Sequence, residues 1–325
     1  MNLRFFALAG RGLLSLTLSA LVGSILVFAM LRLLGGDVAL VILGPEAKPE
    51  AVDALRLELG LNNPWYQQYF DWITGFVTGN LGRSYSGGYD IFEQITVRLG
   101  PTVLLAVGSL LVSLLLALGL GTYSAIHSRA VRGAVLDVGA QIGTAIPAFW
   151  IGLVLIYLFS VVLGWLPAGG YVSPLVDPWG SFLSLVLPIA ALASGSTALL
   201  TRFVRSSMID IMEEDYIRTG MGKGLTFSQA LFRHGLRNAA IPVVTVSALQ
   251  LGNLLAGTIV VENIFVIPGL GRLLMVAVYG REVMVVQSLV FTILLIILVM
   301  NFCLDLAYGL LDPRIGDRRR GGAHG

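Results

Sequence analysis

The chain has 325 residues, of which 56% are hydrophobic and only 12% are charged, and its formal net charge is +2. A soluble domain has about 25% charged residues, so this composition cannot cover a water-facing surface and instead fits a protein surrounded by lipid. The small net charge does not favour nucleic acid as a partner, and the single cysteine, Cys303, excludes an internal disulfide.

Six segments are apolar over the roughly 20 residues that a membrane-crossing helix needs. We predict membrane spans at 13–34, 101–126, 135–163, 182–200, 241–265 and 285–311. Pro147 lies inside the third predicted span. The first span could instead be a signal peptide, because Arg4 and Arg11 precede it. Its length and the lack of a clear small-residue cleavage site favour a retained anchor.

Basic residues gather in every second segment between the predicted spans. The loop 164–181 has none, whereas the loop 202–241 contains several arginines and Lys223. By the positive-inside rule, residues 1–12, the loop 202–241 and the basic tail 312–325 are expected in the cytoplasm. Residues 35–100 then form an extracytoplasmic segment, and both termini are cytoplasmic.

Two short helices are predicted in the segment 35–100. One covers Pro49–Leu59, with proline in its first turn and Gly60 after its end. The other covers Pro64–Thr78 and is rich in aromatic residues, which favour the boundary between membrane and water. This helix could be a platform that receives a delivered solute, or a lid that packs on the membrane helices. We favour the lid.

The loop between the fourth and fifth predicted spans contains a pattern typical of two capped helices. Acidic residues 213–215 suit a helix start, and we expect Glu214 to pair with Arg218 four residues later. Gly224 should end this helix. Thr226 and Gln229 then have capping-box spacing, which predicts a second helix start.

This helix pair has two interpretations. A short, well-capped pair that protrudes from the membrane could dock on another protein. It could also be a solvated loop held at the lipid headgroups by Arg233 and Arg237.

The fifth predicted span contains a polar and small face formed by Ser247, Gln250, Asn253 and Gly257. This face could line a wet pathway, or it could pack closely against another membrane helix. An ion-coupled transporter would place acids deep within its helices. The candidate acids Glu262, Asp305 and Asp137 all lie toward the ends of predicted spans.

Sequence signatures of catalysis and metal binding are missing. Neither Lys48 nor Lys223 ends a phosphate-binding loop, and there is no zinc-ligand motif or nucleophile elbow. The three histidines, His127, His234 and His324, lie far apart in the sequence. We therefore expect no catalytic residue, no metal site and no cofactor site in this chain.

Many short fragments along the chain match one family in their order. In the first half they are Gly36–Asp37, Gly44–Ala47, Leu59–Leu61, Gln68–Tyr69 and Leu81–Ser84. In the second half they are Gly164–Pro167, Asp215–Thr219, Lys223–Leu225, His234–Pro242, Pro268–Gly271 and Leu311–Arg314. Together they resemble the membrane permeases of ABC importers for dipeptides, oligopeptides and nickel, specifically the first of the two permease subunits.

The resemblance implies an all-α integral membrane protein of the type I ABC importer permease fold, with six transmembrane helices and a permease core at 101–311. It implies an inner-membrane location and an assembly with a second homologous permease, two ATPase domains or subunits, a solute-binding protein or lipoprotein outside, and membrane lipid. ATP and Mg would be bound by the ATPase partners. Peptides are the expected substrate, and a nickel chelate, glutathione or another small solute stays open.

The resemblance also implies a cytoplasmic coupling helix that docks on an ATPase. The residues expected at this contact are Glu213, Glu214, Asp215, Tyr216, Arg218, Thr219, Gly220, Lys223, Gly224 and Leu225. Gly220 and Gly222 stand where the family usually has alanine, and each glycine costs a helix roughly 0.5–1 kcal/mol. We therefore expect a helix that is marginally stable alone and is ordered by its partner.

Other departures from the family pattern are Val38, where proline is common, and Asn80, where aspartate is common. The alternative from a different class is an ion-coupled secondary transporter. Those folds often contain internal repeats, and none is evident in this sequence.

Overall fold

A computed structural model of the protein describes residues 2–34, 38–44, 46–128, 130–231 and 236–311. This part of the chain is all helical, apart from one isolated antiparallel bridge between Arg83 and Asp90. The five longest helices are α1 (Asn2–Leu34), α5 (Ile91–Ile126), α8 (Pro178–Met212), α11 (Leu236–Ile264) and α13 (Val283–Leu311). The predicted helical membrane architecture is confirmed.

Four helical stretches within the described residues are long and apolar enough to cross a membrane. They are Ala9–Leu33, Ile91–Ile126, Pro178–Met212 and Val283–Cys303, and a bent helix pair brings the number to five. The 29-residue helix α11 covers the remaining predicted span. The count of six spans stays a prediction.

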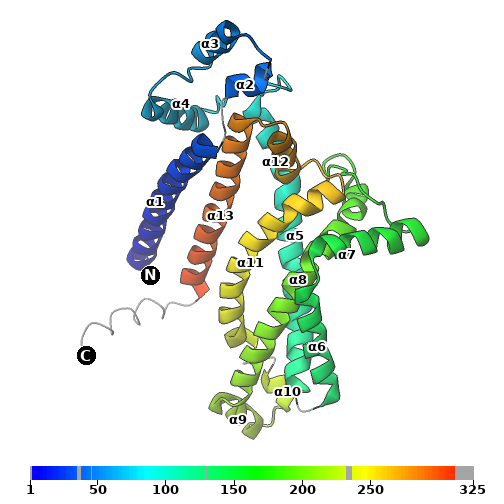
Figure 1. Cartoon of the computed structure of the whole chain (residues 1–325). Helices are drawn as coiled ribbons and strands as arrows, with labels where there is room; N and C mark the ends of the chain where they lie inside the picture. The colour runs from blue at the N-terminus through cyan, green and yellow to red at the C-terminus, as the bar shows by residue number, and fades with distance from the viewer. Residues whose placement is uncertain (1, 35–37, 45, 129, 232–235, 312–325) are drawn as a thin grey trace.

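The third predicted span corresponds to a bent pair of helices and not to one continuous helix. Helix α6 (Val131–Ala145) is followed by α7 (Ala148–Leu155) and the π-helix η1 (Ile156–Val162), and the two parts meet at 100°. Pro147 has no amide hydrogen and disfavours helical geometry in the residue before it. Ile146 is accordingly extended, with φ −86° and ψ 124°. Figure 1 shows α7 leaving the other helices sideways.

Two helices extend well beyond their predicted apolar spans. Helix α5 begins ten residues before the predicted boundary, after Asp90, whose carboxylate accepts a hydrogen bond from the Glu93 amide at 2.9 Å. Helix α8 begins after Asp177, which accepts from the Trp179 amide at 3.0 Å. The added start of α5 contains Glu93, Gln94 and Arg98, and the added end of α8 contains Arg202, Arg205 and Asp210, so hydropathy alone does not detect these turns.

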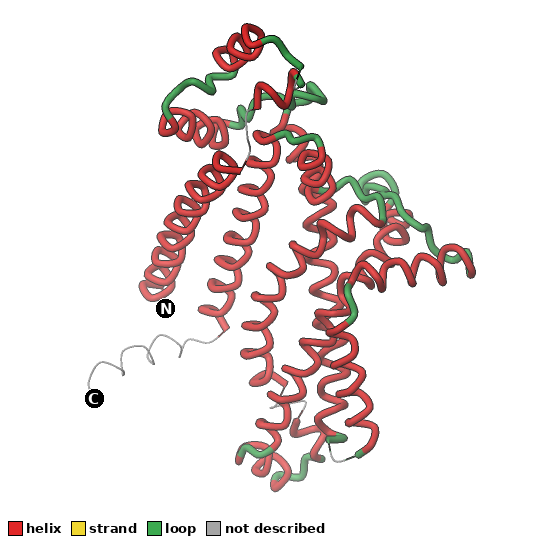
Figure 2. The backbone as a smooth tube through the Cα atoms, in the orientation of Figure 1, coloured by secondary structure: helices red, strands yellow, loops and turns green. Residues whose placement is uncertain are grey.

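The helices form two groups joined at one end of the molecule (Figures 1 and 2). Helices α5, α6, α8 and α11 pack together, and α1 lies beside α13. One end has α2 (Val38–Leu43), α3 (Pro49–Glu58) and α4 (Trp65–Thr78), and the opposite end has α9 (Asp215–Gly222) and α10 (Phe227–Ala230). Following the charge-based orientation, we call these the outer end and the inner end.

The predicted helices of the outer segment are confirmed as α3 and α4. Helix α3 is followed by Gly60 and α4 by Gly79, both with positive φ. Trp72 of α4 is buried among aromatic rings of α1 and α13, with Phe28 at 6.4 Å and Phe291 at 5.3 Å between ring centroids. One side of α4 thus packs on the membrane helices as a lid would. Its other side leaves Tyr66 and Phe70 exposed, and Trp65 in its first turn is exposed too.

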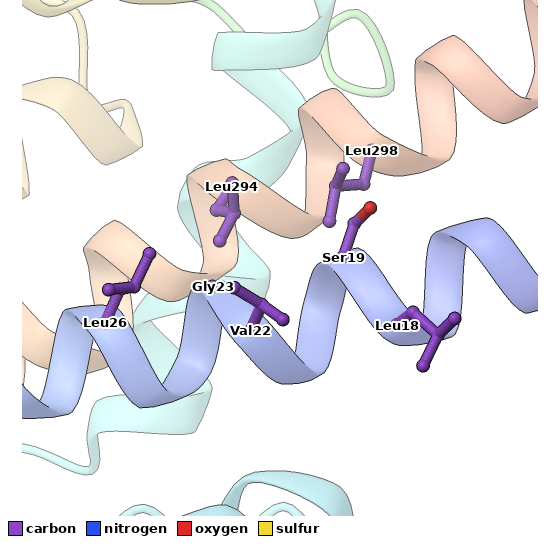
Figure 3. Close-up of a pocket in the computed structure, with 7 residues that line it drawn as sticks. All are labelled: Leu18, Ser19, Val22, Gly23, Leu26, Leu294 and Leu298. Atoms are coloured by element: carbon purple, nitrogen blue, oxygen red, sulfur yellow. The ribbon is translucent and has the colours of Figure 1, made fainter.

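Helix α1 contacts α13 along a seam that depends on small residues. A side-chain carbon at Gly23 would clash with Leu294, and one at Gly12 would lie 2.8 Å from the Phe302 ring. Figure 3 shows an apolar pocket along this seam, lined by Leu18, Ser19, Val22, Gly23, Leu26, Leu294 and Leu298. Glycine therefore sets how closely the two helices approach.

Replacing Gly23 with valine should destabilise the α1–α13 contact, because overpacking costs about 1–3 kcal/mol. We expect Gly23→Val to lower the midpoint of thermal unfolding in detergent, and Leu294→Ala added to it to restore part of the loss. Gly10→Val is the matched control, because a side-chain carbon there meets no atom within 4 Å. Equal losses at Gly10 and Gly23 would contradict this description of the seam.

Candidate functional site

Helix α9 at the inner end is short; no side chain caps its start, and a glycine turn closes its end. Glu214 precedes it in an extended conformation, and Asp215 lies in its first turn. At the other end the Gly224 amide donates to the Met221 carbonyl at 2.9 Å and the Leu225 amide to the Gly220 carbonyl at 3.3 Å. Gly224 has φ +91°, so these bonds form a Schellman ending. The predicted role of Gly224 as the helix end is confirmed.

The predicted capping box also exists. The Thr226 amide donates to the Gln229 side-chain oxygen at 3.0 Å, and the Gln229 amide donates to the Thr226 hydroxyl at 3.3 Å. This reciprocal pair starts α10. Arg233 and the side chain of Arg237 lie outside the described residues, so their predicted contact with headgroups stays a prediction.

The predicted pair between Glu214 and Arg218 is wrong. The Arg218 guanidinium instead lies 3.9 Å from the carboxylate of Asp215, three residues earlier. Glu214 is the residue before the helix and is extended, so it does not occupy the helical position that the i, i+4 spacing requires. Both side chains of the observed pair are largely exposed, and such pairs contribute little to stability.

Helix α9 has one buried face and one exposed face. Ile217 is fully buried in a cluster with Leu200, Val204 and Met208 of α8, Ala117 and Ala125 of α5, Leu231, and Val243 of α11. Tyr216 and Leu225 pack at the edge of this cluster, and Gly220 is buried too. The side chains that stay exposed include Glu213, Glu214, Asp215, Arg218, Thr219, Met221 and Lys223.

This arrangement fixes α9 to the ends of three long helices while leaving a polar surface free to meet another molecule. Sequence reasoning missed Ile217, although it selected the residues on both sides of it. The sequence does contain a signal that Ile217 is buried, because it is the aliphatic residue between the charged residues Asp215 and Arg218. What could not be seen is that the cluster which buries it comes from three other helices.

The four residues proposed to line a pathway are not equivalent in the structure. Ser247 and Gln250 are buried, and the Ser196 hydroxyl of α8 lies 3.4 Å from the Gln250 side-chain oxygen. A side-chain carbon at Gly257 would lie 2.8 Å from Leu192 of α8. These three residues lie in helix contacts, whereas Asn253 is exposed. A role in lining a pathway stays a prediction.

A buried carboxylate lies near the outer end of α11. Glu262 is fully buried, and it accepts hydrogen bonds from the Thr102 hydroxyl of α5 at 2.6 Å and from the Arg272 amide at 3.0 Å. The Leu270 amide donates to the Thr102 hydroxyl at 2.8 Å. Glu262 thus binds the start of α12 (Leu270–Tyr279).

A second set of contacts ties the outer segment to the junction of α12 and α13. The Ser86 hydroxyl donates to the carboxylate of Glu282, and the Tyr85 hydroxyl donates to the sulfur of Met284. Burial, reinforced by the nearby Glu282 carboxylate, raises the pKa of Tyr85. The phenol therefore keeps its proton and remains a donor at neutral pH.

The sequence of this chain matches a known protein family. Residues 117–317 match the family described as the binding-protein-dependent transport system inner membrane component, and residues 3–106 match the corresponding N-terminal family. The chain belongs to this family. It is an inner-membrane, multi-pass permease component of an ABC transporter and not an enzyme itself. Family membership also removes the ion-coupled secondary transporter as an alternative.

Relatives match the chain over nearly its whole length. A probable peptide ABC transporter permease protein of Sinorhizobium fredii is 36% identical over 303 residues, which cover 93% of this chain and 96% of the relative. A putative peptide transport system permease protein of Brucella suis is 36% identical over 299 residues, covering 91% and 94%. The glutathione transport system permease protein of Escherichia coli K12 is 36% identical over 303 residues, covering 93% and 96%.

Two glycines of the α9 region should respond oppositely to alanine. Gly222→Ala adds a side chain into open space within a helix and should stabilise α9 by about 0.5–1 kcal/mol. Gly224→Ala places a side chain at positive φ and should destabilise the helix end by about 1 kcal/mol. Amide hydrogen exchange across 215–225 should slow in the first variant and accelerate in the second. A shift in the same direction for both would contradict the assigned helix ending.

Proposed function

We propose that this chain forms half of the translocation pathway of a peptide importer and is driven through α9 by separate ATPase subunits. The observation that carries the proposal is the two-faced structure of α9. Its buried Ile217 is held in a cluster shared by α5, α8 and α11, while Asp215, Arg218 and Lys223 are exposed. A force applied to the exposed face would reach three long helices through packed side chains.

The proposed partners follow from the missing phosphate-binding loop and from the exposed surface of α9. Its sequence contains no phosphate-binding loop, so ATP and Mg would be bound by two ATPase domains or subunits. A second homologous permease would complete the pathway, and a solute-binding protein or lipoprotein would deliver substrate at the outer end. Closure of the ATPases would then switch the permease pair between inward-open and outward-open states.

The marginal stability of α9 fits this role. The helix has eight residues, two of which are the glycines Gly220 and Gly222, and isolated helices of this length are unstable in water. Gly220 is buried against the cluster, so Gly222 is the glycine whose conformational cost is not offset by packing. We propose that an ATPase subunit orders α9 by contact with its exposed face.

The substrate class is proposed from the relatives. Proteins named as peptide permeases and as glutathione permeases share similar identity with this chain, and glutathione is itself a short peptide. Short peptides are therefore the common chemistry. A nickel chelate or another small solute handled by the same architecture is the alternative.

Charge reversal at Arg218 tests the coupling contact. In the reconstituted assembly, Arg218→Glu should lower peptide-stimulated ATP turnover by about tenfold, the factor that about 1.4 kcal/mol of lost interaction produces. The permease should still insert into the membrane, because Arg218 is exposed and its ion pair is weak.

The matched control is Arg56→Glu at the outer end. Arg56 also pairs with an aspartate three residues earlier, Asp53, on an exposed helix, but it cannot reach an ATPase at the inner end. Unchanged ATP turnover in Arg218→Glu, or an equal loss in Arg56→Glu, would place the contact elsewhere.

Substrate class can be separated by ATP turnover with the cognate binding protein present. We expect di- to pentapeptides to stimulate turnover above its basal rate, with glutathione giving a smaller response and a nickel chelate none. Stimulation by the chelate alone would favour the alternative substrate. Stimulation by none of these solutes would contradict the peptide proposal while leaving the family assignment intact.

A further inference from the structure

Helix α12 has an unusual start, because the side chains that cap it come from other helices. It begins after Gly269, which has no side chain to accept the first helical amides. Two of those amides instead bind groups from elsewhere in the fold. The Leu270 amide donates to Thr102 of α5, and the Arg272 amide donates to Glu262 of α11.

These bonds form one directional chain. The Thr102 hydroxyl accepts from the Leu270 amide, and it donates to Glu262 at 2.6 Å, a much shorter contact than its 3.4 Å to the Arg98 carbonyl. Both oxygens of Glu262 therefore act as acceptors, as a carboxylate does. A negative charge at this place is stabilised by the positive end of the α12 helix dipole. Removal of either side chain leaves buried amides without a partner.

The glycines beside this cap make room for it. A side-chain carbon at Gly269 would overlap the Glu262 carboxylate, and one at Gly271 would overlap Ile259 and lie 3.0 Å from the Glu262 oxygen. The residue that directly follows α11 is also held in place, because the Gly170 amide donates to the Phe265 carbonyl at 2.7 Å. The outer ends of α5, α11 and α12 and the loop around Gly170 thus converge on one place.

The helices joined by this cap are also joined at the inner end. Helices α5 and α11 contribute Ala117, Ala125 and Val243 to the cluster that buries Ile217 of α9. At the outer end the same helices provide Thr102 and Glu262, and α12 packs against α5, α11 and α13. Figure 1 shows α12 and α9 at opposite ends of these long helices.

We infer that Glu262 and Thr102 are positioning residues that bind α12 to α5 and α11, so that the outer end of the pathway moves with them as one unit. The inference rests on the proposed coupling through α9 for its functional consequence. Movement transmitted along α5 and α11 then repositions α12, whose outer face exposes Val276, Val278 and Tyr279. Without these hydrogen bonds, α12 no longer moves together with α5 and α11.

The decisive comparison is Thr102→Val against Thr102→Ser in the full assembly with its ATPases and binding protein. Valine matches threonine in shape but lacks the hydroxyl, whereas serine keeps it. We expect Thr102→Val to keep assembly and basal ATP turnover within about twofold, and to lower stimulation by binding protein and peptide by about tenfold. Thr102→Ser should retain stimulation within about threefold of the unmodified protein.

Equal behaviour of the valine and serine variants would overturn the inference. A purely structural role would lower assembly and basal turnover together with stimulation, and that result would overturn it too.

Amide hydrogen exchange in the unmodified permease tests the cap without any ATPase and without a variant that must fold. First-turn amides of a helix normally exchange fast, because they lack partners within the helix. We expect the amides of Leu270 and Arg272 to exchange as slowly as the central amides of α5 and α11. Exchange as fast as that of solvent-exposed first-turn amides would overturn the inference. Failure of the α9 proposal alone would leave this protection intact.

Discussion

A protein in lipid must find partners for its backbone amides within itself, and this constraint shapes the helix ends of the permease. An unpaired amide in hydrocarbon costs several kcal/mol, so each buried helix start needs an acceptor. Helix α12 has such a buried start, at a glycine, and its acceptors come from Thr102 and Glu262 on other helices. The starts of α5 and α8 are exposed, and the adjacent residues Asp90 and Asp177 cap them locally. The buried start is thus the one that depends on side chains distant in the sequence.

The sequence predicts what depends on local chemistry. Long apolar runs place the membrane helices, and the caps of α9 and α10 follow from Gly224, Thr226 and Gln229, because each acts on residues within four positions. Helix ends are less predictable, since the first turns of α5 contain Glu93, Gln94 and Arg98 and the last turns of α8 contain Arg202, Arg205 and Asp210, which weaken the hydropathy signal. Pro147 was visible, but the 100° bend also depends on the packing of α7 against α8 and α11.

The candidate site is also predictable only in part, because it depends on contacts between residues far apart in the sequence. The exposed residues of α9 form one continuous segment that the sequence pattern marks, yet Ile217 is buried by a cluster that includes residues up to 100 positions earlier in the chain. The partner of Arg218 was wrong because the helix begins one residue later than the spacing assumed. Thr102 and Glu262 lie 160 positions apart, so no local pattern connects a threonine in one span with a glutamate in another.

The tight contact between α5 and α8 limits how a displacement at one end of the molecule can be transmitted to the other end. Small residues bring these helices together along their length: a side-chain carbon at Gly108 would lie 2.8 Å from Ile189, and one at Gly121 would lie 2.6 Å from Val204. Between them the Ser113 hydroxyl donates to the Ala193 carbonyl at 3.1 Å. Interfaces packed this closely do not deform continuously. Because Ile217 of α9 lies in one cluster with residues of α5 and α8, the proposed displacement of α9 would move the α5–α8 pair as one body, and the cap on α12 lies toward the far end of that body.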